Sequence, residues 1–387
     1  MKSIGFIPLR KGSKGIVNKN KRRLLGRPLF TWVLGEAIQS QLDEIFVFTD
    51  DESIISYVNS EYQYTKKVRA ILRGDENAQD ESTTESAILE FTEMINYDFD
   101  TLCLLQATSP FTKTEDIDNG IRKLGEGLDS VLSVVNLKRF AWDKTGNPLN
   151  YSLNMRPRRQ DFEGLLMENG AIYLTTRANF HRNKNRLGGK IGMIEMRENS
   201  FHELDSLSDW IVAENLIVQE AKMNKKCKKI THLVLDVDGV FTDGTVSFTH
   251  TGEHTKQFDM RDGMGLELLK EEGVEIIVIT SENSELVQER MKKLSINKVH
   301  LGIRDKYTYL KGLLNNEGVL FDNVAYVGDD INDLFSMCCS AWSFAPKNAT
   351  RLIKNHADIL LDNISGHGAI REVIEFIVDY NKRFIEC

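Results

Sequence analysis

Two short apolar segments, far apart in the chain, each lead directly into a polar loop that contains glycine. The first is Ile4-Gly5-Phe6-Ile7, followed by a loop from Arg10 to Asn20; the second is residues 232–235, followed by Asp236-Val237-Asp238-Gly239. A short apolar run that ends in such a loop is typical of a buried parallel strand that carries a ligand site at its carboxyl end. Because the pattern restarts halfway along 387 residues, it predicts two α/β domains.

Further apolar runs alternate with helical patterns in both halves, which favours mostly parallel sheets covered by helices. In the second half, the predicted helices include residues 265–272 and 331–337. Residues 245–258 instead alternate polar and apolar side chains around Thr251-Gly252, a pattern typical of a hairpin. We therefore expect two Rossmann-like three-layer domains, at residues 1–223 and 230–387, joined by a lysine-rich linker at residues 224–229.

Charge and composition exclude several classes of protein. Lys plus Arg is 49 and Asp plus Glu is 57, so the formal net charge is 49 − 57 = −8. This balance argues against a general nucleic-acid binder. No apolar run approaches the length of a membrane span, and the N-terminal residues lack the apolar core of a signal peptide. The five cysteines have no zinc-site spacing, so we expect reduced thiols in a cytoplasmic protein with no membrane partner.

The loop after the first apolar run places Arg10, Lys11, Lys14 and Lys19 around two glycines. Glycine lets backbone N–H groups approach phosphate oxygens, and the cations offset their charge. The loop is not a Walker A motif, since Gly-Lys-Ser/Thr is absent. From the residues alone, a phosphate loop and a basic surface turn both remain open.

The stretch from Ile7 to Asn20 closely resembles the first motif of the CMP-sialic acid synthetases (acylneuraminate cytidylyltransferases), from which it departs at Leu9. Residues 105–110 (Leu-Gln-Ala-Thr-Ser-Pro) and 169–173 (Asn-Gly-Ala-Ile-Tyr) resemble later motifs of the same family, with Ala107 replacing a proline. The resemblance implies a nucleotidyltransferase fold that transfers CMP from CTP to a sialic acid.

The resemblance also implies roles for individual residues. Four residues would hold the triphosphate: Arg10, Lys14, Lys19 and Asn20. Of these, Lys14 and Lys19 would also take part in catalysis. Arg73 and Gln106 would face the cytosine side, and Gln106, Asn169 and Tyr173 would help to define the sugar site. In the basic run at residues 156–160, Arg158 or Arg159 could bind the sugar carboxylate, with Arg159 taken as the candidate; a solvated basic loop is the alternative for either one.

An acidic pair, Glu203 and Asp205, lies two residues apart, so an extended backbone would place both carboxylates on one face. Such a pair suits Mg²⁺, which favours oxygen ligands and substrate phosphates. The synthetase family has Asp-x-Asp here, and Glu203 replaces the first Asp. The alternative is a capped start of the helix expected at residues 207–223.

In the second half, Asp236 at a strand end can act as nucleophile and metal ligand, and Asp238 can act as general acid and base. With Thr280-Ser281, Lys306 and residues 327–333, this loop resembles the four motifs of the haloacid dehalogenase phosphatases. The resemblance implies that Thr280 or Ser281 binds the phosphate and that Lys306 screens its charge. The Mg²⁺ ligands would be Asp236, Asp238 and Asp329, with Asp333 as a support behind them.

Residues 238–244 and 261–265 look like the capless branch of that superfamily, which contains the Kdo-8-phosphate and KDN-9-phosphate phosphatases. Only the hairpin at residues 245–258 fits between the first motif and the next helix, so we expect a small flap in place of a cap domain. Three charged residues are candidates for substrate contacts: Glu282, Arg290 and Lys293. For Arg290 and Lys293, the alternative is a charged helix face in contact with solvent. Members of this branch typically form homotetramers.

The leading hypothesis is a bifunctional enzyme that dephosphorylates a sialic acid 9-phosphate and then activates the freed sugar with CTP, using Mg²⁺ in both domains. We expect a homo-oligomer in which the C-terminal domain forms a tetramer and the N-terminal domain a dimer. One alternative is a C-terminal domain that is only a structural or regulatory module. Another is a Kdo enzyme: a CMP-Kdo synthetase with a Kdo-8-phosphate phosphatase.

Overall fold

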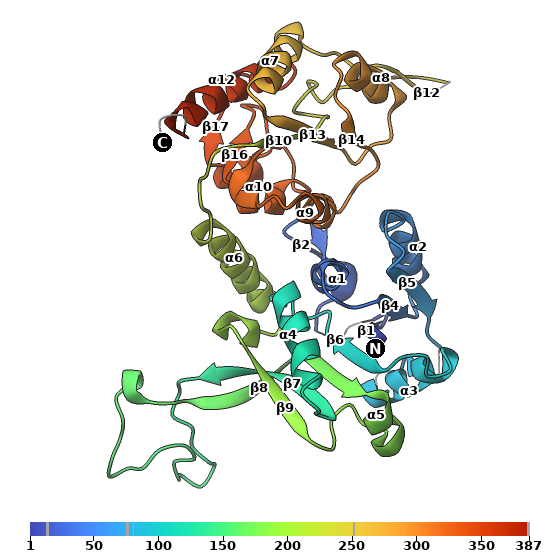
Figure 1. Ribbon diagram of the computed structural model, residues 1–387, viewed down its shortest axis with the longest axis vertical. Coiled ribbons are helices and arrows are strands. Elements are labelled where there is room, and N and C mark those ends of the chain that lie inside the picture. Colours follow the sequence, from blue (N-terminus) through green and yellow to red (C-terminus); the bar gives the residue numbers. More distant parts are fainter. Residues whose placement is uncertain (13–14, 75–76, 80, 251, 385–387) are drawn as a thin grey trace. The chain divides into compact units, whose positions relative to one another are not determined.

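The computed structural model describes residues 1–12, 15–74, 77–79, 81–250 and 252–384 (Figure 1). By its internal contacts the chain divides into two compact units, an N-terminal one of residues 1–23 and 28–213 and a C-terminal one of residues 24–27 and 214–387. Both are α/β, as the sequence predicts. The linker expected at residues 224–229 stays a prediction.

The N-terminal unit is built on a seven-stranded sheet with the order β5-β4-β1-β6-β8-β7-β9. Its strands are β1 (Ser3–Leu9), β4 (Glu44–Thr49), β5 (Val68–Leu72), β6 (Thr101–Leu105), β7 (Ser130–Leu137), β8 (Leu165–Thr176) and β9 (Ile191–Met196). The strands are parallel except for β8, which runs antiparallel to β6 and β7. Residues 138–164, between β7 and β8, project beyond the sheet (Figure 1). The short strands β2 (Arg23–Leu24) and β3 (Arg27–Pro28) pair with each other.

Helices cover both faces of this sheet, because successive side chains of β1 point to opposite faces. Ile7 and Leu9 lie in one core cluster with side chains of α1 and α4. Ile4 and Phe6 lie in another cluster with Phe91 of α3. The result is the three-layer domain expected from the sequence. The helices are α1 (Leu29–Gln39), α2 (Glu52–Glu61), α3 (Thr84–Met94), α4 (Thr114–Leu124) and α5 (Arg177–Asn183), and α6 (Leu207–Met223) begins in this unit and ends in the next.

The C-terminal unit contains a six-stranded sheet, all parallel, with the order β14-β13-β10-β15-β16-β17. Its strands are β10 (His232–Leu235), β13 (Glu275–Ile279), β14 (Lys298–His300), β15 (Val324–Val327), β16 (Trp342–Ala345) and β17 (Ile359–Leu360). Its helices are α7 (Met260–Glu271), α8 (Glu285–Lys293), α9 (Lys306–Glu317), α10 (Leu334–Cys339), α11 (Arg351–His356) and α12 (Ala369–Asn381). A separate antiparallel pair, β11 (Ser247–Thr249) and β12 (Gly252–Thr255), forms the hairpin predicted at residues 245–258.

Two predicted helix starts are wrong. The helix expected from residue 265 begins five residues earlier, because Asp259 accepts a hydrogen bond from the Arg261 N–H and caps α7. The helix expected from residue 331 begins only at Leu334, because the Asp333 carboxylate accepts the Asp329 and Asp330 N–H groups and holds that segment in a turn.

The two apolar segments that precede the glycine-containing loops, β1 and β10, occupy equivalent places in their sheets. β1 lies between β4 and β6, and β10 lies between β13 and β15, each parallel to both neighbours. The chain leaves such a strand toward one side of the sheet and later returns to the other, so the loops diverge and open a crevice at the carboxyl end. Each predicted ligand loop begins at such a crevice. None of the helices in the described ranges is long and apolar enough to cross a bilayer.

Candidate active sites

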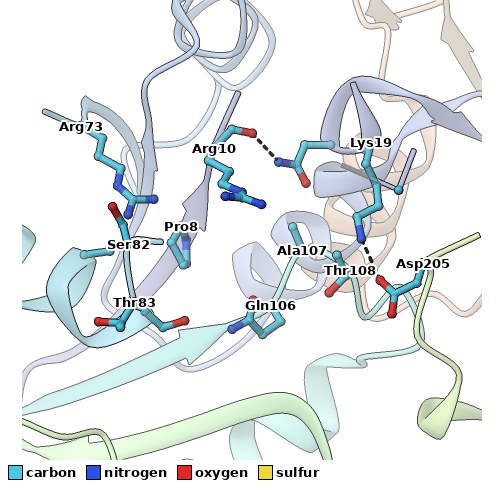
Figure 2. A pocket seen from close by; sticks show the side chains of 14 residues that line it. Pro8, Arg10, Lys19, Arg73, Ser82, Thr83, Gln106, Ala107, Thr108 and Asp205 are labelled. Carbon is cyan, nitrogen blue, oxygen red and sulfur yellow. Dashed lines mark hydrogen bonds and ion pairs between the residues drawn. The ribbon is translucent and has the colours of Figure 1, made fainter. Parts of the chain in front are cut away.

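A cavity of about 450 Å³ opens in the N-terminal unit where β1 and β6 end (Figure 2). Its walls contain most of the residues predicted for the triphosphate and the nucleoside. The lining residues are Pro8, Arg10, Gly15, Lys19, Asn20, Arg73, Ser82, Thr83, Thr84, Ala87, Gln106, Ala107, Thr108 and Asp205. Lys14 lies outside the described residues.

Hydrogen bonds fix the basic loop after β1. Lys19 Nζ donates to the Leu204 carbonyl at 2.9 Å and to Asp205 Oδ1 at 3.2 Å, and Asn20 Nδ2 donates to the Arg10 carbonyl at 3.2 Å. Figure 2 shows Lys19 and Asp205 on one side of the cavity and Arg73 on the other, with Arg10 between them. Cations from both sides therefore face a space that can accept a polyanion.

Arg73 is the most buried cation of this cavity, with 6% of its surface exposed. Burial lowers the pKa of its guanidinium, while the Glu90 and Asp50 carboxylates raise it. Its Nη2 donates to the Asn77 carbonyl, which orients the group. Since an arginine stays protonated in proteins, Arg73 supplies a fixed positive charge.

The acidic pair lies in a segment, residues 202–205, that is neither helix nor strand, and Leu204 is fully buried between the two exposed acids. Asp205 lines the cavity and pairs with Lys19. Glu203 is absent from the described lining and lies beside Gly170 instead. The metal roles of both stay predictions.

Three predicted sugar-site residues also lie outside the cavity lining. Asn169 is buried, accepts from Ser133 Oγ at 2.6 Å and donates to Ser200 Oγ at 3.0 Å. The Tyr173 hydroxyl donates to the Glu168 carboxylate, and Arg159 is exposed in a 3-10 helix at residues 159–161. Their contacts are structural as far as the described residues show, and their substrate roles stay predictions.

One wall of the cavity, rich in hydroxyl groups and formed by Ser82, Thr83 and Thr84, is not among the predicted site residues. Thr83 caps α3 by accepting the Ser86 N–H at 3.1 Å. The start of a helix favours anions because its N–H groups lack intrahelical partners. A run of Ser and Thr directly before a helical pattern is the signal that marks this wall.

In the C-terminal unit, the predicted nucleophile stands at the end of β10 with 5% of its surface exposed. Lys306 Nζ lies 2.8 Å from Asp236 Oδ1, and the Val237 N–H donates to the same oxygen at 2.7 Å. Lys306 is the first residue of α9, and the preceding Asp305 caps that helix. The helix start therefore delivers the lysine to the strand end.

Lys306 also joins Asp236 to Asp333. Its fully buried ammonium lies 2.7 Å from Asp333 Oδ1, which accepts the Tyr326 hydroxyl at 2.8 Å as well. The second oxygen of Asp333 accepts the Asp329 N–H at 3.3 Å. Asp333 thus holds both Lys306 and the loop after β15, and its predicted role as a support behind the metal ligands stays a prediction.

The carboxylates of this cluster are hard to ionise together. Burial raises the pKa of Asp236 to about 7, although the Lys306 charge opposes this. Burial, with the charges of Asp333 and Asp236, raises the pKa of Asp329 to about 8. Burial lowers the pKa of Lys306, but the two neighbouring carboxylates outweigh it and raise that pKa above its usual range.

Three carboxylates in the cluster fit a divalent cation. Asp236, Asp329 and Asp333 each offer an oxygen, and these atoms lie within 4.8 Å of one another. Asp329 Oδ1 is buried and has no hydrogen-bond partner in the described structure. An unpaired buried carboxylate oxygen is costly unless a cation meets it. Asp238 is not in this group, and its predicted metal role stays a prediction.

A close approach between two loops shapes the site. Gly239 has φ +86°, and a Cβ added there would lie 2.1 Å from Asp329 Oδ2. Only glycine combines this left-handed backbone with room for the carboxylate. The loop after β10 therefore meets the loop after β15 at the candidate metal site.

The predicted phosphate-binding hydroxyls follow β13. Thr280 is nearly buried and its Oγ1 accepts the Glu282 N–H at 3.3 Å. Ser281 Oγ accepts from Asn332 Nδ2 at 3.0 Å and donates to the Ile303 carbonyl at 3.2 Å. These contacts connect the loop after β13 to the segments that carry Lys306 and Asp333.

The three predicted substrate contacts differ in their surroundings. Glu282 and Lys293 are exposed. Arg290 is half-buried, with its guanidinium carbon 5.5 Å from the ring centre of Phe258. Its Nε and Nη2 are buried and have no hydrogen-bond partner among the described residues, so Arg290 is the member of the three best placed to receive an anion.

Comparison with known proteins identifies relatives for both units. A family model described as cytidylyltransferase matches residues 4–231, and one described as haloacid dehalogenase-like hydrolase matches residues 301–374. The N-acylneuraminate cytidylyltransferase of Oncorhynchus mykiss is 32% identical over 98% of this chain and 89% of its own length.

The C-terminal part has relatives of its own. The 3-deoxy-D-manno-octulosonate 8-phosphate phosphatase KdsC of Haemophilus influenzae is 34% identical over 40% of this chain and 87% of its own length. A solved structure of the corresponding phosphatase from Moraxella catarrhalis, in complex with magnesium, phosphate and KDO, is 33% identical over 44% of this chain and 97% of its own, with a TM-score of 0.39.

Proposed function

The chain belongs to the N-acylneuraminate cytidylyltransferase family and carries a haloacid dehalogenase-like hydrolase domain in its C-terminal part, and we propose that it removes phosphate from a sialic acid 9-phosphate and then joins the freed sugar to CMP. The chain is thus a nucleotidyltransferase combined with a phosphoric monoester hydrolase. The two reactions are consecutive, since the product of the second domain is the acceptor of the first.

In the N-terminal reaction, the anomeric hydroxyl of the sugar attacks the α-phosphorus of CTP, and the β- and γ-phosphates leave together as pyrophosphate. Arg10, Lys19 and Asn20 bind the triphosphate in the cavity, and Arg73 and Gln106 face the cytosine side. Fixed cations that meet the developing charge of the leaving pyrophosphate lower the barrier. The cavity lining supports this assignment.

In the C-terminal reaction, a carboxylate oxygen of Asp236 attacks the phosphorus, the ester O–P bond breaks, and Asp238 gives a proton to the leaving alkoxide. Asp238 then takes a proton from water, which attacks the aspartyl phosphate and releases inorganic phosphate and free Asp236. Lys306, 2.8 Å from Asp236, offsets the charge of the transferring phosphoryl group.

We propose Mg²⁺ as the cofactor of both domains. Asp236, Asp238 and Asp329 would hold it in the C-terminal unit, with Asp333 as a support behind them, and Asp205 with Glu203 would hold it in the N-terminal unit. The ion would neutralise phosphate charge during both transfers. The carboxylate cluster with the unpaired Asp329 oxygen supports the first site, and the position of Asp205 in the cavity lining supports the second.

The intact buried cluster of Asp236, Lys306 and Asp333 is the observation that carries the phosphatase proposal. A purely structural domain has no need to keep a buried lysine between two carboxylates, since such clusters cost desolvation energy. The cluster therefore disfavours the non-catalytic alternative.

Reciprocal variants of the full chain test the two-site proposal. Asp236→Asn should abolish phosphate release from N-acetylneuraminic acid 9-phosphate and leave CTP-dependent pyrophosphate release with free N-acetylneuraminic acid unchanged. Lys19→Ala should do the opposite. If either variant removes both activities, or if the unaltered chain releases no phosphate in the presence of Mg²⁺, the proposal of two independent active sites is wrong.

The sugar is the second question, because the relatives of the C-terminal part include Kdo 8-phosphate phosphatases. We propose a sialic acid in both reactions. Pyrophosphate release with Neu5Ac, KDN, legionaminate and Kdo, together with phosphate release from the matching phosphate esters, decides between them. Turnover of the Kdo pair alone would establish the alternative.

We also propose a homo-oligomer, a tetramer through the C-terminal domain with a dimer of the N-terminal domain. Exposed apolar side chains support this: Leu149 and Leu153 are each 64% exposed in the N-terminal unit, and Phe248 and Met260 are each 70% exposed in the C-terminal unit. Sedimentation velocity on the full chain should give four times the chain mass; a monomer at micromolar concentration contradicts the proposal.

We place both reactions in the cytoplasm. In the described part of the chain, Cys103, Cys227 and Cys338 form no disulfide, as is usual for a reducing compartment. Fractionation of cells that express the full chain tests this placement.

A further inference from the structure

Lys256, which is not among the predicted site residues, binds the carboxylate of the candidate general acid, Asp238. Lys256 Nζ lies 2.7 Å from Asp238 Oδ1 and 2.9 Å from Oδ2. The side chain of Lys256 is 2% exposed and that of Asp238 is 30% exposed. Contacts to both oxygens hold the carboxylate group in one position.

Lys256 follows β12 directly and so stands at the base of the β11–β12 hairpin. The hairpin itself reaches into solvent, since Ser247–Thr249 are exposed and Phe248 is 70% exposed. A buried ammonium next to such an exposed segment is unfavourable unless an acid meets it. Asp238 is such an acid, since Lys256 Nζ contacts both of its oxygens.

A second contact fastens the same segment to the loop after β10. Phe258, two residues beyond Lys256, packs edge-on against Phe241 with 5.5 Å between ring centres and 68° between ring planes. Thr242 Oγ1 lies 3.4 Å from Asp238 Oδ1 on the same loop. The base of the hairpin and the loop that carries Asp238 are therefore held together at two points.

We propose that Lys256 is a positioning residue, which orients the Asp238 carboxylate toward the leaving oxygen of the phosphate ester and so couples the hairpin to proton transfer. The inference rests on the proposed roles of Asp236 and Asp238. It assigns no contact between Lys256 and the substrate. Lys256 should therefore matter only when the leaving group needs a proton.

Two substrates distinguish an effect of Lys256 on proton transfer to the leaving group from a general loss of phosphatase activity. N-acetylneuraminic acid 9-phosphate has an alkoxide leaving group that needs a general acid, whereas p-nitrophenyl phosphate has a leaving group that departs as a stable anion. The quantity to measure is kcat/KM, because it reports the steps up to the transfer of phosphate to Asp236. A general acid is worth about 10²–10⁴-fold on a step that needs it.

In the full chain with Mg²⁺, Lys256→Met should lower kcat/KM for the sugar phosphate at least about tenfold and that for p-nitrophenyl phosphate less than about threefold. Lys256→Arg should restore part of the loss, since it keeps a cation that can meet both carboxylate oxygens. Gln257→Met is the matched control in the same segment, because Gln257 is exposed, and both rates should stay unchanged. Retained p-nitrophenyl phosphate turnover also shows that the variant is folded.

A double-mutant cycle tests whether Lys256 acts through Asp238. If it does, Lys256→Met should have little further effect on the sugar phosphate in an Asp238→Asn background. An equal loss with both substrates, no loss with either, or a full additional loss in the Asp238→Asn background overturns the inference. If the unaltered chain hydrolyses neither substrate, the proposed function has failed instead, which is a distinguishable result.

Discussion

Removing the buried Lys306 ammonium should destabilise the C-terminal unit far more than an ordinary surface change. Lys306→Met keeps most of the side-chain volume but leaves Asp236 and Asp333 without their cation, and the side chains of these two acids are 7% and 0% exposed. Breaking a buried ion pair costs about 3–5 kcal/mol, because a charge is left in a low-dielectric environment.

Hydrogen exchange measures this cost in the full chain. Amides of β10, next to Asp236, should lose protection by roughly 10²–10⁴-fold in EDTA, which is the factor that ~3–5 kcal/mol gives when the whole unit opens. Amides of β1, in the other unit, serve as an internal reference and should not change. Lys292→Met is the control variant, because the Lys292 side chain is 79% exposed.

A partial rescue makes the reasoning more specific. Adding Asp333→Asn to Lys306→Met should recover part of the lost protection, because one of the two unpaired buried charges is then gone. If Lys306→Met costs β10 no more protection than Lys292→Met does, the buried charges do not govern the stability of this unit and the argument fails.

Three further perturbations have outcomes that the structure sets. Gly239→Ala should lower the phosphatase kcat at least about tenfold, because the φ of +86° at Gly239 and the carboxylate of Asp329 leave no room for a Cβ. CTP-dependent synthesis should stay intact, and unchanged phosphatase turnover would refute the close approach. Mg²⁺ at 100 times its Kd should stabilise the C-terminal unit by about 2.7 kcal/mol, and Asp329→Asn should remove this gain, as read from the exchange of β10 amides. Burial raises the pKa of Asp262 from 3.8 to about 6, so its ionisation costs no stability below pH 3.8 and an increasing amount up to pH 6. Asp262→Asn, which can still accept the Arg371 N–H, should therefore gain stability relative to the unaltered chain as pH rises from 4 to 6, by at most about 3 kcal/mol; a difference that does not change with pH contradicts this.

The sequence predicts the fold class and the strand-end residues well, because both depend on local patterns. Apolar runs that end in Gly or Asp loops place Arg10 and Asp236 at the carboxyl ends of β1 and β10, and parallel pairing then fixes the crevices. Lys306 and Asp333 follow from motif order, and the structure brings both to Asp236.

What the sequence does not predict depends on contacts across the chain. The pairing of Lys256 with Asp238 depends on how the hairpin folds back, and no local pattern specifies this. The early start of α7 depends on the Asp259 cap. Gly263 and Gly265 weaken the helical pattern of this segment, so the sequence alone does not indicate that the helix begins before them. Asn169 matches a motif, yet its side chain is buried and bonded to Ser133 and Ser200. The identity of a residue does not show whether its side chain points into the cavity or into the core.

Phosphorus NMR of a single reaction tests the central claim most directly. The full chain is mixed with N-acetylneuraminic acid 9-phosphate, CTP and Mg²⁺, with no other enzyme. The phosphomonoester signal should be replaced by that of inorganic phosphate, and CMP-sugar and pyrophosphate signals should then appear, whereas with Asp236→Asn neither reaction should take place. A CMP-sugar that still carries the 9-phosphate, or synthesis that proceeds unchanged in Asp236→Asn, would contradict the central claim.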